Sequence, residues 1–563
     1  MSAIGAFTFV LHSHLPYARM AGRWPHGEEW VHEAATETYI PLLKMLFDLK
    51  EEGVNFRLTL GMTPTLAEQL SDPLVLKNLN HYLDSKIEAA QRDIKHFEHH
   101  ERDAIHLQNL ARWYVAQFTD VRDTLNNRFG GDIIGRFKEL QQAGYLELFA
   151  SAATHAYLPL LAQDSAVNGQ IKAGIASYKR IFGVQPRSFW LPECGYRPAV
   201  VDDMQQRPGL ERFLMENGIE LFFSETHTIT GGKPVGVATG DVIGPTGAVK
   251  RRYVIPKEAT TPQRLATTHL PYYVSDSLLG RGAQEHSGVA VIGRNNNSGQ
   301  QVWSADWGYP GDFDYLEFYK KSGTSGLQYW RVTGDDVQLD RKDVYHPDWA
   351  RYKVDQHAEH FAHLVGDLLR EFHKETGEYG IVSSNYDTEL FGHWWFEGVD
   401  WLGKVLRHLA ANPEIEMTTA SDYVKAHPPQ AVLHLPEGSW GAGGTHFTWD
   451  NAETHWMWTP IGEAERRMEV LVANFQQPTP DEEFALNQAA RELLLLQSSD
   501  WQSLITTGQA KEYAIQRFTQ HMDRFNQLAD GLDAGQPDMA LAKDLWEKDK
   551  VFPDLDYRWF KAR

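Results

Sequence analysis

Short apolar segments alternate with longer amphipathic segments along most of the first 430 residues, and this alternation limits the fold more than any other feature. The longer segments, such as residues 165–182 and 354–374, have the spacing of amphipathic helices. Such alternation is typical of a parallel sheet or barrel covered by helices. The apolar segments predict strands at residues 5–11, 55–60, 145–150, 188–191, 221–224, 288–292, 380–384 and 416–418.

Two regions depart from this pattern. Residues 73–129 are polar and helix-patterned, and their histidines lack a compact ligand spacing, so we expect a helical insertion with a solvated face. After about residue 460 the strands stop, and four helical segments follow. We therefore expect an α/β catalytic unit at residues 1–72 and 130–430, the insertion at 73–129, and a C-terminal helical domain at 431–563.

Composition narrows the class of partner. A formal net charge of −21 disfavours nucleic acid and anionic membrane surfaces, whereas a neutral sugar is compatible with it. No apolar segment approaches the roughly 18 residues of a membrane helix, and the first residues lack the basic start of a signal peptide. The single cysteine, Cys194, excludes an intramolecular disulfide and fits a reducing compartment, so we expect a cytoplasmic protein.

Polar side chains follow the ends of the predicted strands. In parallel β/α barrels the carboxyl ends of the strands meet at one face, where function is located. The sequence therefore predicts one polar pocket ringed by strands. The residues at these ends are His12, His14, Thr63, His155, Glu193, Glu225, His227, Arg294 and Asp387.

Two carboxyl groups in this set suit glycoside cleavage. Glu193 and Asp387 each follow an apolar strand directly. A retaining glycosidase needs one ionised carboxylate and one protonated carboxyl group, which come from different strands and face each other. Glu225 and Glu389 are rival carboxylates by position, and Cys194, beside Glu193, is better explained by packing than as a nucleophile.

The pair His12 and His14 permits a second hypothesis. A His-x-His at the end of a first strand can bind a catalytic metal, and His155, His227 and Asp387 could complete such a site. Alternatively, the imidazoles form hydrogen bonds with sugar hydroxyls, or are simply buried and satisfied. The residues themselves leave these interpretations open.

Five motifs resemble those of glycoside hydrolase family 57, and most closely those of its 1,4-α-glucan branching enzymes. They occur in the family's order and extend over nearly the whole chain. They are HSHLPY (residues 12–17), GMTP (61–64), WLPEC (190–194), DTELFGHWW (387–395) and SSDW (498–501).

The resemblance implies a fold and a mechanism. The fold is a distorted (β/α)7 barrel with a helical insertion and a C-terminal helical domain that helps to wall the cleft. The chemistry is retaining and uses neither metal nor cofactor, with Glu193 as nucleophile and Asp387 as general acid/base. Sugar contacts are implied at His12, His14, Trp24, His155, Arg294, Trp303, Asp500 and Trp501, with Trp440 and Trp449 on the acceptor side.

The implied substrate is an α-glucan, cleaved at an α-1,4 bond and transferred to a 6-hydroxyl. The sequence departs from relatives at Asn385-Tyr386, at Gly195 and Arg197, and in a predicted lid, residues 231–247, which lacks tyrosine. The ratio of branching to hydrolysis therefore stays open. Alternatives are an α-1,4-glucan hydrolase or 4-α-glucanotransferase, a metal-dependent hydrolase or deacetylase using His12 and His14, and an inactive glucan-binding protein.

Overall fold

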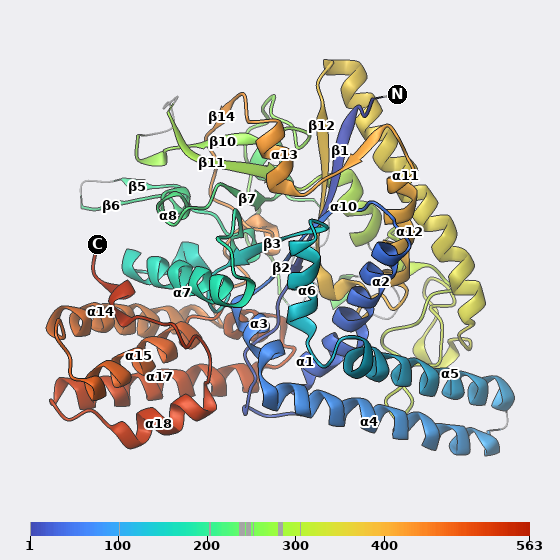
Figure 1. Cartoon of the computed structure of the whole chain (residues 1–563), viewed down its shortest axis with the longest axis horizontal. Coiled ribbons are helices and arrows are strands. Elements are labelled where there is room, and N and C mark those ends of the chain that lie inside the picture. The colour runs from blue at the N-terminus through green and yellow to red at the C-terminus, as the bar shows by residue number, and fades with distance from the viewer. Residues whose placement is uncertain are drawn as a thin grey trace.

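The centre of the molecule is a curled sheet, seen in a computed structural model that describes residues 2–100, 102–201, 204–235, 242–243, 249–250, 253–279, 285–304 and 306–563. Seven consecutive neighbours run parallel in the order β12-β1-β2-β3-β4-β7-β11 (Figure 1). These strands are β1 (Gly5–Ser13), β2 (Leu58–Met62), β3 (Leu146–Ser151), β4 (Ser188–Trp190), β7 (Leu221–Ser224), β11 (His286–Gly293) and β12 (Gly380–Asp387).

Three further strands extend the sheet. β10 (Tyr272–Ser275) pairs antiparallel with β11, β14 (Val432–Leu433) pairs with β10, and β13 (Ile415–Met417) pairs with the start of β1. Two small hairpins lie apart from it. They are β5 (Val200–Val201) with β6 (Gln206–Arg207), and β8 (Val242–Ile243) with β9 (Val249–Lys250).

The two ends of the parallel series approach each other. The backbone N–H of Asn295, just after β11, donates to the carbonyl of Ser383 in β12 at 2.9 Å. This contact brings β12 and β11, the two end strands of the parallel series, together. The sheet therefore curls into an open, distorted barrel. The (β/α)7 architecture expected from the sequence is thereby confirmed.

Both faces of the sheet are buried, which explains why its strands appear as continuous apolar segments. Every residue of β1 is buried, and alternate side chains enter different cores. Ala6 and Val10 join a compact cluster inside the barrel. Phe7 and Phe9 join the outer core, where the ring of Phe9 stacks on Phe361 with centroids 5.9 Å apart.

Helices cover the outside of this sheet, and the longest of them, α11, lies alongside β1 and β12 (Figure 1). The helices of this layer are α1 (Glu29–Ala34), α2 (Ile40–Glu51), α3 (Pro64–Ser71), α6 (Ile133–Gln142), α7 (Asp164–Phe182), α8 (Leu210–Glu216), α9 (Thr226–Thr230), α10 (Asn296–Trp303), α11 (Pro347–Thr376), α12 (Gly398–Ala410) and α13 (Ala420–Ala426).

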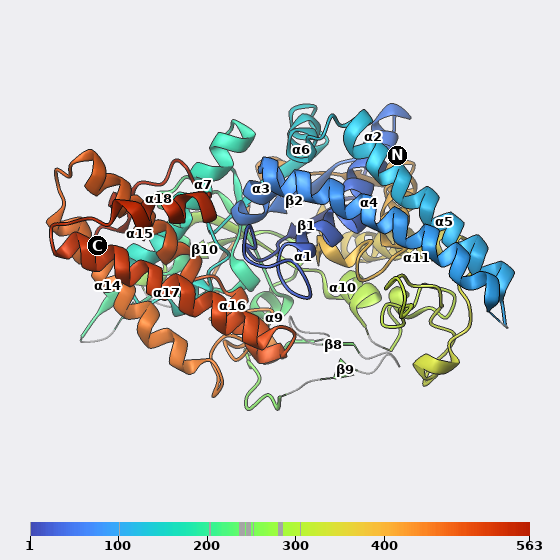
Figure 2. The same cartoon turned by 90° about the horizontal axis from the view of Figure 1, so that it is seen from below.

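Two helical appendages flank the barrel. α4 (Pro73–His96) and α5 (Ala104–Asp123) lie side by side, and the Asp72 carboxylate caps α4 by accepting from the N–H of Leu74. The C-terminal helices gather at the other end of the molecule, coloured orange to red in Figures 1 and 2. They are α14 (Trp458–Asn474), α15 (Pro480–Leu496), α16 (Asp500–Thr507), α17 (Lys511–Asp533) and α18 (Met539–Lys548).

The predicted strands are all present, with ends that differ by a few residues. The sequence did not predict β10 or α16. β14 lies within the segment assigned from sequence to the C-terminal domain, whose helices begin at Trp458. Among the described residues, no helix combines the length and the apolar character that crossing a bilayer would require.

The barrel interior depends on Gly61 in β2. A Cβ added at Gly61 would lie 1.9 Å from the Cε2 atom of Phe149, whose ring belongs to the interior cluster. Overpacking of this kind usually costs about 1–3 kcal/mol. We expect Gly61→Ala to lower the free energy of unfolding by about 1–3 kcal/mol. The denaturant concentration at the midpoint of unfolding should fall accordingly.

The matched control is Gly323→Ala. A Cβ at Gly323 meets nothing within 4 Å, so this variant should unfold with the wild-type midpoint. An unchanged midpoint for Gly61→Ala would show that Phe149 can move aside without penalty.

Candidate active site

Charged and polar side chains lie at the carboxyl ends of the parallel strands. Neighbouring side chains contact each other around the barrel mouth. The strand register places His12 of β1 beside Asp387 of β12. His12 Nε2 lies 3.0 Å from His155 Nε2, and His155 Nδ1 lies 3.9 Å from Glu193 Oε1. The structure therefore brings most of the predicted pocket together.

Glu193 lies in the tight turn Pro192–Cys194, which begins two residues after the end of β4. Glu193 and Cys194 have φ values of 62° and 50°, a left-handed conformation that costs non-glycine residues about 1–3 kcal/mol each. Trp440 holds this turn twice: its indole Nε1 donates to Glu193 Oε2 at 2.6 Å, and its backbone N–H donates to the Glu193 carbonyl at 3.0 Å. The carboxylate is thus fixed before any substrate arrives.

Asp387 is the last residue of β12 and keeps part of its surface open. Burial raises the pKa of Asp387 well above its ordinary value, the negative charges of Glu389 and Glu193 raise it further, and Arg294 opposes the shift. A raised pKa favours the protonated form of this carboxyl group, the form that a general acid needs. The effect of the Glu193 charge on this pKa indicates that the two carboxyl groups lie near each other at the barrel mouth.

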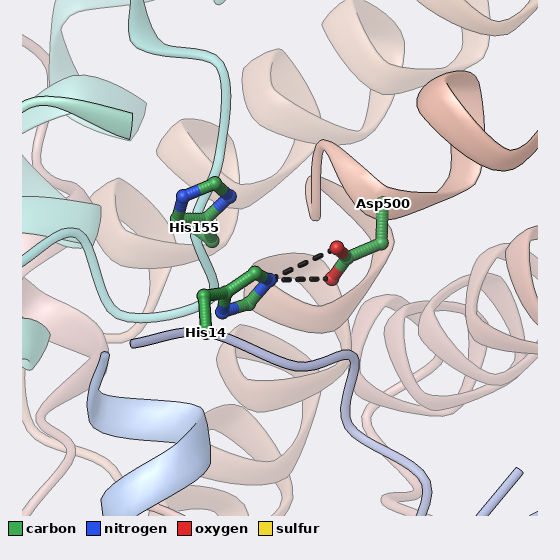
Figure 3. A group of neighbouring side chains, drawn as sticks. All are labelled: His14, His155 and Asp500. Atoms are coloured by element: carbon green, nitrogen blue, oxygen red, sulfur yellow. Dashed lines mark hydrogen bonds and ion pairs between the residues drawn. The ribbon is translucent and has the colours of Figure 1, made fainter. Parts of the chain in front are cut away.

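Three imidazoles stack beside these carboxyl groups. The His155 ring is a neighbour of both others, with centroid distances of 5.1 Å to His12 and 3.9 Å to His14. Asp500, at the start of α16, faces His14, whose Nε2 lies 2.9 Å and 3.1 Å from its two oxygens (Figure 3). The C-terminal helices thereby contribute a side chain to the barrel mouth.

The ring nitrogens of His14 and His155 already have protein partners. His14 Nδ1 contacts Thr63 Oγ1 at 2.8 Å, and His155 Nδ1 contacts Ser499 Oγ at 2.9 Å. Burial, reinforced by the neighbouring imidazoles, lowers the pKa of both His12 and His155 well below the ordinary value, so both rings are neutral. Neutral imidazoles can exchange hydrogen bonds with sugar hydroxyls.

The metal hypothesis can be tested on this geometry. His14, His155 and Asp500 each offer a ligand atom, all within 4.8 Å of one another. The Nε2 atom of His14 already contacts Asp500, and the Nε2 atom of His155 already contacts His12. His227, which the hypothesis also used, has Glu225 and Arg294 as its charged neighbours instead. The arrangement favours a hydrogen-bonded wall over a metal centre.

Arg294 and Glu225 form a buried ion pair next to this wall, with Nη2 2.9 Å from Oε2. The pairing makes Glu225 a weaker candidate nucleophile than Glu193. Glu225 Oε1 and both ring nitrogens of His227 have no partner among the described residues. Glu225 and His227 line a cavity of 150 Å³. These polar atoms of the barrel mouth can therefore form hydrogen bonds with a ligand.

The five predicted indoles occupy different environments. Trp24 is 77% exposed, and Trp303, at the end of α10, is partly exposed. Trp440 is buried against Glu193. Trp449 and Trp501 have no exposed surface: Trp449 stacks on Tyr157 with centroids 4.0 Å apart, and Trp501 donates to the Leu495 carbonyl. In this structure these two indoles are fully buried, so a sugar contact at either requires rearrangement.

Sequence reasoning missed several supporting residues. Tyr39, in the turn Ala35–Tyr39, donates its hydroxyl proton to Glu389 Oε1, and Tyr157 contacts His446 Nδ1 at 2.7 Å. Ser499 lies inside the SSDW motif, which was a usable signal, whereas no local pattern links Tyr39 to a residue 350 positions later.

Two further sequence-based interpretations can be placed. Burial raises the pKa of the Cys194 thiol well above its ordinary value, which disfavours a thiolate nucleophile. The predicted lid, residues 231–247, falls largely outside the described residues, since only 231–235 and 242–243 of it are described.

Comparison with known proteins gives a consistent result. The sequence profile of glycosyl hydrolase family 57 matches residues 8–436, and that of the 1,4-alpha-glucan branching enzyme C-terminal domain matches residues 460–560. The chain is 44% identical to the 1,4-alpha-glucan branching enzyme TK1436 of Thermococcus kodakarensis over 97% of this chain and 77% of that protein.

Solved structures agree with the sequence comparison. The crystal structure of TK1436 superposes with a TM-score of 0.89 at 42% identity, covering 100% of this chain and 97% of that one. A GH57-type branching enzyme of Pyrococcus horikoshii gives 0.86 at 38% identity, with the same coverage. The alpha-amylase AmyC of Thermotoga maritima gives 0.81 at 29% identity, covering 99% of both chains.

These matches extend across the barrel and the C-terminal helices, and they include the segments that carry Glu193, Asp387 and Asp500. A profile match over residues 8–436 spans well over half of the 563 residues. The chain belongs to glycosyl hydrolase family 57.

Proposed function

We propose that the protein is a 1,4-α-glucan branching enzyme, with Glu193 as nucleophile and Asp387 as general acid/base. The observation that carries this proposal is the pair of unlike carboxyl groups at the barrel mouth, one fixed by the indole of Trp440 and the other raised in pKa by burial. The similarity to branching enzymes over nearly the whole chain supports the choice of substrate and acceptor.

In the first step Glu193 attacks the anomeric carbon of an α-1,4-linked glucosyl unit. Asp387 gives its proton to the departing 4-oxygen, so the shortened glucan leaves and a covalent glycosyl-enzyme remains. The Trp440 N–H bond to Oε2 orients the attacking carboxylate. Binding of the rest of the chain holds the anomeric carbon in line with it.

In the second step Asp387, now ionised, takes a proton from a 6-hydroxyl of an acceptor glucan. That hydroxyl attacks the glycosyl-enzyme, forms the α-1,6 bond and releases Glu193. Water would give hydrolysis instead, so transfer needs an acceptor that occupies the position of attack. The exposed indole of Trp24 and the partly exposed indole of Trp303 suit stacking of the neutral α-glucan partner.

The second candidate is hydrolysis of α-1,4 bonds. It is favoured by the similarity to AmyC, named an alpha-amylase, and by the absence of tyrosine from the sequence of residues 231–247. We also propose that the protein acts in the cytoplasm, which suits its single buried cysteine.

Proton NMR of amylose after incubation distinguishes the two candidates. We expect a growing α-1,6 anomeric signal with few new reducing ends. Reducing ends that accumulate while the α-1,6 signal stays flat would identify a hydrolase, and no turnover at all would identify a glucan-binding protein.

Removal of either carboxyl group should almost abolish turnover. We expect Glu193→Ala and Asp387→Ala each to lower kcat by about 10³-fold or more, because each loses a covalent or proton-transfer step. Azide should restore turnover with different stereochemistry: a β-glycosyl azide from Glu193→Ala and an α-glycosyl azide from Asp387→Ala. The reverse pattern would exchange the two roles.

Trp440→Phe removes the donor to Glu193 Oε2 while keeping most of the ring. We expect kcat to fall by about 10- to 100-fold, as for loss of one hydrogen bond to a charged group of about 1.5–3 kcal/mol. Trp349→Phe, at an indole that is 48% exposed, is the control and should retain wild-type kcat. Equal activity of both variants would show that the Trp440 bond does not orient the nucleophile.

A further inference from the structure

Glu389 is a carboxylate near Asp387 to which the two-carboxylate mechanism gives no role. It lies two residues after Asp387, in the turn Thr388–Leu390, and is buried. The backbone N–H of His14 donates to Glu389 Oε1 at 3.1 Å, and the Tyr39 hydroxyl donates to the same oxygen. Donors from the end of β1 and from the turn before α2 therefore converge on one carboxyl oxygen.

These donors favour the ionised form of Glu389, because hydrogen bonds to a carboxylate are stronger than those to a neutral acid. No lysine or arginine in the described part of the chain forms an ion pair with Glu389. Its negative charge is therefore stabilised by hydrogen-bond donors rather than by an ion pair, and it can act on the neighbouring carboxyl group.

The two carboxyl groups respond differently to burial. Burial raises the pKa of Glu389 to about 7, while Tyr39, its own backbone N–H and His14 hold it down. Among the described residues no hydrogen-bond donor to the Asp387 carboxyl group is found. After burial, the charges of Glu389 and then Glu193 raise the pKa of Asp387, and the charge of Arg294 lowers it. The donors to Glu389 Oε1 therefore favour the charge on Glu389 and the proton on Asp387.

We propose that Glu389 is a charged positioning residue that keeps the proton on Asp387 until the leaving glucan takes it. This proposal rests on the proposed acid/base role of Asp387. It also bears on the second step. Once Glu193 is esterified its charge is lost, and Glu389 then supplies the main negative charge acting on Asp387. That charge makes Asp387 a stronger base toward the acceptor 6-hydroxyl.

The test variant is Glu389→Gln, whose amide oxygen can still accept from His14 and Tyr39 while the charge is gone. The protonated form of Asp387 is the active one in the first step, so kcat/KM for glucan falls as pH rises through its pKa. Loss of the Glu389 charge lowers the pKa of Asp387. The alkaline limb of the profile of kcat/KM against pH should therefore move to lower pH by about one unit.

Two companion variants separate charge from shape. Glu389→Asp keeps the charge and should retain an alkaline limb closer to that of the wild type. Tyr39→Phe removes one donor, so Glu389 ionises less readily, and the limb should move in the same direction as in Glu389→Gln but by less. Thermal midpoints of all variants report on folding independently.

An activated donor provides the decisive comparison. α-Maltosyl fluoride has a leaving group that needs no proton, so its kcat/KM should be unchanged in Glu389→Gln even where glucan cleavage is slowed. An equal loss on both donors at every pH would show that Glu389 only holds the local fold, and the proposal would fail.

Failure of the Glu389 proposal can be distinguished from failure of the branching proposal. The alkaline limb is measured from total bond cleavage, whether the product is a branch or a new reducing end. A flat α-1,6 signal in the wild type would overturn branching alone, whereas an unmoved limb in Glu389→Gln would overturn the positioning role alone.

Discussion

Burial of several carboxyl groups at one barrel mouth is the constraint on which the rest of the structure depends. A charge taken out of water is costly unless it is paired or hydrogen-bonded, and neighbouring like charges raise that cost. Each group meets the cost differently. Glu225 is paired with Arg294, Glu193 accepts from the Trp440 indole, and burial raises the pKa of Asp387, which favours its protonated form. These unlike solutions produce the unlike charge states that glycoside cleavage requires.

The C-terminal helices are part of this arrangement because they hold residues that the barrel strands cannot supply. Asp500 and Ser499 orient the His14 and His155 rings from the start of α16. A buried network anchors the helices in turn. Arg517 Nη1 donates to the Tyr17 carbonyl at 3.0 Å, and Arg517 Nη2 donates to His521. The segment that follows the first strand is therefore held by α16 at His14 and by α17 at Tyr17.

That network also shows how burial selects a protonation state away from the active site. Burial lowers the pKa of His521 to about 3, so its ring is neutral. Its Nε2 accepts from Arg517, which leaves Nδ1–H to donate to Glu492 at 2.7 Å. Burial disfavours the charged form of an imidazole. This effect makes the buried histidines neutral both in the helical core and at the barrel mouth.

Much of the fold followed from local pattern. The strands were predictable because the parallel sheet is buried on both faces, so residues such as those of β1 form unbroken apolar runs. β10 was missed because it is short, and its antiparallel pairing with β11 leaves no separate periodic signal. The placement of Glu193 and Asp387 at strand ends needed only the strand boundaries, while Tyr39 and Trp440 reach their carboxylates across hundreds of residues.

The sequence by itself determined the barrel, the two helical appendages, the family motifs and the residues able to perform acid/base and nucleophilic chemistry. It could do so because hydrophobic periodicity and strand ends are local properties. Only the tertiary structure decided which carboxyl groups are paired, protonated or ionised, and which indoles are open to a sugar. Those states depend on solvent exclusion and on neighbours distant in sequence, which exist only after the chain has folded.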